Sequence, residues 1–130
     1  MNEIIHTIID RAYMIKSEAG ALKLSTEAKL YCSSLSLNNL KELSKEDQET
    51  TLELIWVWNL VYSYASWYIK FLAAKNLGAI DENLKEKVSK AFEVFTSGEN
   101  IFHSNQIDFK PHSEMIEAAN KFELKLITIS

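Results

Sequence analysis

An uncharged aromatic run, LIWVWNLVYSYASWYI, covers residues 54–69 and constrains the fold more than any other feature of the chain. It contains every tryptophan of the protein and three of its five tyrosines, and Phe71 follows directly after Lys70. Aromatic side chains bury the largest apolar areas, so a cluster of this density indicates either the core of a fold or the centre of a binding surface. No glycine or proline interrupts the run. We therefore predict one long helix, capped by Ser44 and ended by Asn76 and Gly78.

The composition favours helices around this central segment. The 130 residues include only three glycines and one proline, whereas β-sandwiches and barrels need turn residues every few positions. The content of hydrophobic residues, 47%, and of charged residues, 25%, is typical of a globular domain. We predict a single-domain, all-α helical bundle of about five helices packed around the long aromatic-rich helix.

Apolar spacing and capping residues predict the remaining helices. A first helix is expected over residues 3–19, with Asn2 as its N-cap and Gly20 as its end. The signal from residue 22 to residue 43 is weaker, with a helix capped by Ser25, a break, and a short further piece. Asp81 caps a fourth helix, and Pro111 begins a fifth whose tail also alternates like a strand.

A helical wheel divides the aromatic run into two groups. One narrow stripe is polar, and its neighbours are expected to lie near solvent, whereas Trp58, Tyr64, Tyr68 and Phe71 are expected in the core. Aromatic anchors beside polar residues are typical of protein interfaces. The predicted partner-binding residues are Trp56, Asn59, Tyr62, Ser63, Ser66, Trp67 and Lys70.

Charge and cysteine content exclude several classes of function. The net charge is −4 and Arg11 is the single arginine, which argues against nucleic-acid binding. Cys32 is the single cysteine, so no internal disulfide forms and a cytoplasmic location is expected. The aromatic run is shorter than a membrane span and is bracketed by Glu53 and Lys70, so no membrane association is expected. The N-terminus also lacks the pattern of a signal peptide.

The three histidines do not have the spacing of a metal or catalytic motif. His103, Asp108 and His112 together resemble a 2-His-1-carboxylate set, but they lie in or beside a linker rather than one turn apart on a helix. His6 with Asp10 is typical of a solvated or capping pair. No phosphate-binding loop or nucleophile motif is present. We predict no metal, no cofactor and no enzymatic activity.

An acidic patch precedes the aromatic run. A patch of this kind attracts a basic partner or imitates a phosphate backbone, although Lys41 and Lys45 dilute it and favour an ordinary solvated face. Its members are Glu42, Glu46, Asp47, Glu49 and Glu53.

The expected function follows partly by exclusion. We expect a small non-enzymatic protein-binding module, such as an inhibitor, an immunity-type protein or an adaptor, which binds another protein or a second copy of itself through the polar stripe and its aromatic neighbours. Three alternatives remain open: a small-molecule binder with a pocket beside the central helix, an acidic nucleic-acid mimic, and an enzyme that uses His103, Asp108 and His112.

Overall fold

The computed structural model describes residues 2–34, 40–97 and 109–129, and within these ranges the fold is all-α, as predicted. The aromatic run forms the middle of one continuous helix, α3, which at 32 residues is about 48 Å long. The elements in chain order are α1 (Glu3–Tyr13), α2 (Glu18–Ser34), the short 3-10 helix η1 (Leu40–Glu42), α3 (Lys45–Asn76), α4 (Glu82–Thr96) and α5 (Ser113–Ile127).

Three predicted N-caps are confirmed by their hydrogen bonds. The side chain of Asn2 accepts a hydrogen bond from the amide of Ile4, at 2.8 Å, and begins α1. Ser44 and Asp81 accept from amides three residues ahead and begin α3 and α4. Gly78 adopts the left-handed conformation, with φ of 63°, just after α3 ends. Local sequence signals therefore define the two ends of the longest helix.

The predicted end of the first helix is wrong. Helix α1 ends at Tyr13, and Gly20 lies inside α2 rather than terminating α1. Lys125, which lies near the other end of the sequence, stabilises this termination of α1, because its Nζ donates to the carbonyl oxygens of Tyr13 and Ile15. Ser17 Oγ then accepts from the amide of Gly20, at 3.1 Å, and helps to start α2.

Two further boundaries differ from the prediction. Ser25 lies within α2 instead of capping it. Helix α5 begins at Ser113, two residues after Pro111, with His112 at the N-cap position. The tail that alternates like a strand is helical to Ile127, because Met115, Ala119, Phe122 and Leu126 are all buried along one helical face.

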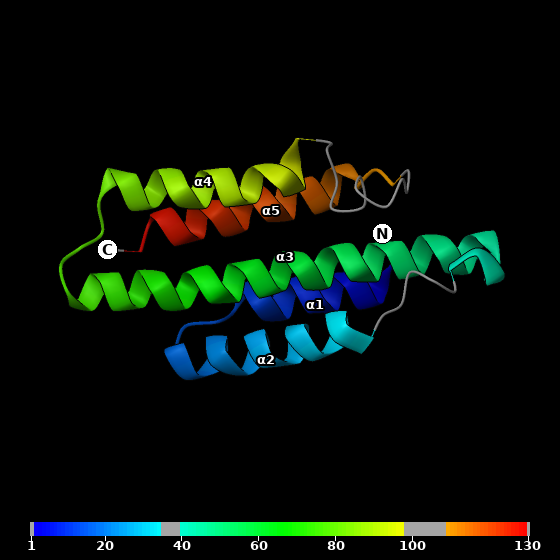
Figure 1. The fold of residues 1–130 in the computed structure, drawn as a ribbon, viewed down its shortest axis with the longest axis horizontal. Helices are drawn as coiled ribbons and strands as arrows, with labels where there is room; N and C mark the ends of the chain where they lie inside the picture. The colour runs from blue at the N-terminus through cyan, green and yellow to red at the C-terminus, as the bar shows by residue number, and fades with distance from the viewer. Residues whose placement is uncertain (1, 35–39, 98–108, 130) are drawn as a thin grey trace.

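Helix α3 lies at the centre of the bundle and contacts all four other α-helices. Figure 1 shows α4 and α5 along one side of it and α1 and α2 along the other. Following the chain colours, α1, α3 and α5 run in one direction, and α2 and α4 run in the opposite direction. Helices α1 and α5 both pack on α3 without extensive contact between themselves. Among the described residues, no helix is sufficiently long and apolar to cross a membrane.

The predicted aromatic core is confirmed. Tyr64 and Phe71 have no exposed surface, and Trp58 and Tyr68 are almost completely buried. Trp58 stacks on Tyr31 of α2 and Tyr64 stacks on Phe122 of α5. Because other helices pack on α3 from several sides, its sequence is apolar around most of the helix.

Candidate functional site

One of the two tryptophans in the predicted partner-binding stripe does not reach the surface. Trp56 is fully buried, with no exposed surface, so the prediction that it lies near solvent is wrong. Its ring meets Phe95 of α4 edge to face, with the centroids 5.8 Å apart. The helical wheel places Trp56 beside the polar stripe, but α4 packs against this side of α3. Trp56 therefore belongs to the core.

The rest of the stripe reaches the surface as a mainly polar strip. Asn59, Ser63 and Ser66 are half-buried, and Asn59 donates its side-chain amide to the carbonyl oxygen of Ile55, at 2.7 Å. Lys70 Nζ lies 4.4 Å from the ring centre of the half-buried Trp67. Tyr62 is 37% exposed. This face offers one exposed aromatic ring rather than a broad apolar surface.

The pocket on this face of α3 is small. It has a volume of about 240 Å³ and lies where α2 meets α3, lined by Lys29, Cys32, Ser33, Asn59 and Tyr62. Cys32 is half-buried, and burial raises the pKa of its thiol, which disfavours the reactive thiolate. This pocket is smaller than the small-molecule alternative requires.

A larger groove lies between α1 and α5. Its volume is about 770 Å³, and its apolar residues come from both helices, with Ile9 and Tyr13 on α1 and Ala118, Phe122 and Leu124 on α5. The charged or ionisable side chains that complete the lining are His6, Asp10, Glu114, Glu117 and Lys121. We call this feature the α1–α5 groove. It exists because both helices pack on α3 but leave a gap between themselves.

An aromatic stack connects the groove to the core. The ring of Tyr64 stacks on Phe122 with the centroids 4.4 Å apart, and Phe122 stacks on Tyr13 at 6.2 Å. Exposure increases along the stack, from none at Tyr64 and Phe122 to 44% at Tyr13. Burial also raises the pKa of Tyr64, so its phenol stays protonated. The surface ring of Tyr13 therefore rests on rigid, buried neighbours.

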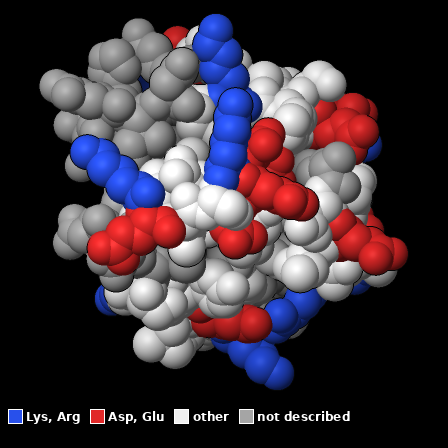
Figure 2. All heavy atoms as spheres, turned by 90° about the vertical axis from the view of Figure 1, so that its right-hand side faces the viewer, with Lys and Arg blue, Asp and Glu red and all other residues white. Residues whose placement is uncertain are grey.

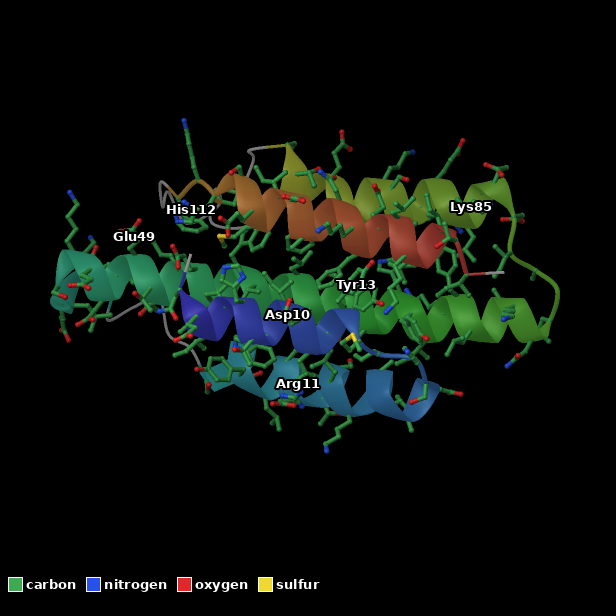
Figure 3. All side chains as sticks on the ribbon, turned by 180° about the vertical axis from the view of Figure 1, so that it is seen from behind. Asp10, Arg11, Tyr13, Glu49, Lys85 and His112 are labelled. Carbon is green, nitrogen blue, oxygen red and sulfur yellow. The ribbon has the colours of Figure 1, made fainter. Side chains whose placement is uncertain are left out.

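Acidic groups outnumber cations around the α1–α5 groove. His6 Nε2 lies 3.4 Å from Glu114 Oε2, and Lys121 Nζ lies 3.4 Å from Glu117 Oε1. With Asp10 the lining contains three carboxylates and one lysine. Figure 3 shows Asp10 and Tyr13 on the side of α1 nearer to α5, whereas Arg11 is directed toward α2, where it donates to Glu27 at 2.8 Å. Lys125 Nζ, 4.8 Å from the ring centre of Tyr13, adds a second cation beside the groove. The groove therefore combines an apolar floor with a weakly negative rim of three carboxylates and two lysines.

The predicted acidic patch is only partly a surface feature. Glu42, Glu46, Asp47 and Glu49 are exposed, and Figure 2 shows acidic groups next to lysines at this end of the bundle. Glu53 differs from them, because it is only 6% exposed. The patch is therefore smaller than the sequence suggests.

Glu53 pairs with the histidine at the N-cap position of α5. Its Oε1 lies 2.8 Å from His112 Nε2, and Glu49 places a third ligand atom nearby, all within 4.8 Å of one another. Figure 3 shows Glu49 and His112 at the same end of the bundle. Among the described residues this is the group with the composition and geometry to hold a metal ion. His103 and Asp108, the other members of the predicted histidine set, lie outside the described residues.

Sequence reasoning missed both of these arrangements. The α1–α5 groove joins residues from opposite ends of the chain, and Tyr13 fits the apolar stripe of its own helix, so nothing marks it as a groove residue. Glu53 and His112 are 59 positions apart. The available signal was the unusual position of Glu53 directly beside a run of buried apolar residues.

Comparisons with known proteins identify no relative: no family model, no curated protein and no solved structure matches this chain.

Proposed function

We propose that this protein is a small, non-enzymatic, cytoplasmic protein-binding module, of the inhibitor, immunity-type or adaptor kind. In this proposal it binds a basic amphipathic helix of another protein in the α1–α5 groove. The observation that carries the proposal is the groove itself, with an apolar floor between two helices and a predominantly acidic rim.

The shape of the groove favours a helical partner. Helices α1 and α5 run in the same direction along α3 (Figure 1), and residues from His6 to Tyr13 of α1 and from Glu114 to Leu124 of α5 line the groove between them. A partner helix with apolar residues at positions i, i+3 or i+4, and i+7 places one face into such a groove. Tyr13, held by the stack on Phe122, supplies a rigid aromatic contact with little loss of side-chain freedom on binding.

The charge of the rim selects the partner. Asp10, Glu114 and Glu117 favour lysine or arginine next to the apolar face of the bound helix, because complementary charges accelerate association and penalise acidic competitors. The chain as a whole has a net charge of −4, which adds to the attraction. Such binding weakens as the salt concentration rises.

A selection of displayed helical peptides against the full chain tests this proposal. The peptides recovered are expected to carry lysine or arginine beside an apolar stripe. In fluorescence anisotropy, Leu124→Glu and Glu117→Lys are each expected to weaken binding by about tenfold or more. Leu124 is 58% exposed, so its replacement does not disturb the core.

Matched controls on other helices separate groove effects from general changes in charge. Leu30→Glu on α2 and Glu86→Lys on α4 replace exposed residues of the same types outside the groove, and each is expected to change affinity by less than about twofold. Peptides that bind all four variants equally well would refute the groove as the binding site.

A second copy of the chain is the competing occupant. Sedimentation of the wild-type protein distinguishes the two cases, because a homodimer formed through the groove would dissociate in Leu124→Glu and persist in Leu30→Glu. A dimer that behaves in this way would show that the groove binds a second copy of the chain rather than another protein. A monomer at all concentrations would leave the groove free for another protein.

A small ligand is the second candidate for the same groove. Its volume of about 770 Å³ lies in the range of small-molecule sites, and the exposed ring of Tyr13 provides a stacking surface. A planar ligand that raises the melting temperature of the wild-type protein, but not of Tyr13→Ala, would favour this candidate. The stripe residues Tyr62, Trp67 and Lys70 remain a predicted secondary contact surface.

A further inference from the structure

We propose that Glu49, Glu53 and His112 form a binding site for a transition-metal dication of the Zn²⁺ class at the end of the bundle where α5 begins. This inference is independent of the α1–α5 groove, since it concerns different side chains and a different class of ligand.

The backbone places the three ligands together. Glu49 and Glu53 are separated by one turn on α3, so both carboxylates lie on the same face of that helix. His112 is at the N-cap position of α5 and makes no side-chain hydrogen bond to the helix amides, which leaves its imidazole directed toward α3. One ligand atom from each residue lies within 4.8 Å of the other two.

The charge of the cluster favours a dication. Glu53 is 6% exposed, and a buried carboxylate is costly unless a cation or several donors compensate it. The described ion pairs give neither Glu49 nor Glu53 a lysine or arginine partner. His112, which contacts Glu53, is a cation only when its imidazole is protonated. Two carboxylates, a neutral imidazole and one dication give a net charge of zero.

The ligand types indicate which metal. Imidazole nitrogen suits Zn²⁺ and its neighbours in the first transition series, whereas Mg²⁺ and Ca²⁺ prefer oxygen ligands alone. Zinc bonds to nitrogen and carboxylate oxygen are about 2.0–2.2 Å long, so small side-chain adjustments of exposed Glu49 and His112 are needed to bring all three ligand atoms, now within 4.8 Å of one another, around one ion. The metal then replaces the hydrogen bond between His112 Nε2 and Glu53 Oε1. Three protein ligands leave one tetrahedral position for water.

Calorimetric titration of the tag-free, chelator-treated full chain with ZnCl₂ tests the site. We expect one Zn²⁺ per chain, no competition from millimolar Mg²⁺, and a visible absorption band of tetrahedral type when Co²⁺ is used instead. Glu49→Gln, Glu53→Gln and His112→Ala should each weaken Zn²⁺ binding by about tenfold or more.

Two matched variants serve as controls. Glu46→Gln replaces another exposed acid of α3, and His6→Ala removes the histidine of the other described His–Glu pair, so both should retain wild-type affinity. Circular dichroism establishes that each variant is folded, and exposed Glu49 provides a variant that does not alter the core if Glu53→Gln unfolds. Zinc binding that is absent, or equally strong in Glu49→Gln and His112→Ala, would overturn the proposal.

Discussion

Two successive segments in the middle of α3 are both rich in apolar and aromatic residues but have different surroundings. In residues 52–60 nearly every side chain is buried, including Glu53 and Trp56. In residues 61–71 only one side of the helix is buried, and Tyr62 and Lys70 reach solvent. Trp56 and Trp67 lie on the same side of the polar stripe, yet one is fully buried and the other is half-buried. We refer to these segments as the closed half and the open half of α3.

This difference teaches where a helical wheel is informative. The wheel describes correctly which residues share a face, but the exposure of that face depends on the elements packed against it. Phe95 of α4 covers the ring of Trp56, whereas the half-buried Trp67 packs against the core and carries Lys70 of α3 over its ring. The same pattern of residues therefore produces a core contact in one half and a surface contact in the other.

The largest expected difference is between the two tryptophans. Trp56→Ala should lower the free energy of unfolding by about 3–5 kcal/mol, because it opens a cavity beside Phe95. Trp67→Ala should cost only about 1 kcal/mol, since its ring is already partly in water. Urea denaturation measures both values. Equal losses for the two variants would remove the distinction between the closed and open halves.

A smaller effect is expected from the histidine that covers the closed half. His112→Ala removes the partner of buried Glu53 and should cost about 1–3 kcal/mol in the presence of a chelator. His6→Ala is the matched control, because its partner Glu114 is 56% exposed, and it should cost less than about 0.5 kcal/mol. Urea denaturation of both variants in one buffer makes this comparison. A cost for His6→Ala as large as that of His112→Ala would show that burial of the carboxylate is unimportant.

The ion pair between α1 and α2 should contribute less and depend on pH. Arg11 lowers the pKa of Glu27 below its ordinary value of 4.5 by a direct hydrogen bond. The native state therefore binds this proton less readily than the unfolded state, so the stabilisation is present above that value and is lost as the pH falls through the lowered pKa. Both side chains are substantially exposed, so the contribution is about 0.2–1 kcal/mol.

Thermal or urea unfolding of Glu27→Gln and the wild-type protein from pH 7 to pH 2 measures this contribution. The two stability curves should differ at neutral pH and converge in acid. Curves that remain parallel over the whole range would show that the ion pair is not the source of the difference.

A similarly small effect is expected in the open half. Lys70→Gln removes the cation above the Trp67 ring and should cost about 0.5 kcal/mol, because the contact is at the surface. The indole fluorescence of Trp67 should also change as its environment becomes more accessible to water. A protein that carries both Trp56→Phe and Trp58→Phe isolates this signal. A loss of several kcal/mol would place this contact in a buried environment and contradict the open character of this half.

Much of the fold was predictable because its signals are local. The caps Asn2, Ser44 and Asp81 act within three residues of themselves, and the core residues Trp58, Tyr64 and Phe71 follow the helical period. The candidate sites were less predictable. The polar strip of α3 was found, but the α1–α5 groove and the pairing of Glu53 with His112 depend on contacts between distant segments.

The sequence by itself determined an all-α fold around one aromatic helix, since helical periodicity, capping and the scarcity of glycine and proline are properties of neighbouring residues. The tertiary structure alone decided where α1 ends, through Lys125, 110 positions away from Ile15. It also decided that Trp56 is core, that Glu53 meets His112, and that a groove separates α1 from α5. The physical reason is common to all four: which helix covers a given face is fixed by packing between elements, and no local pattern of residues encodes it.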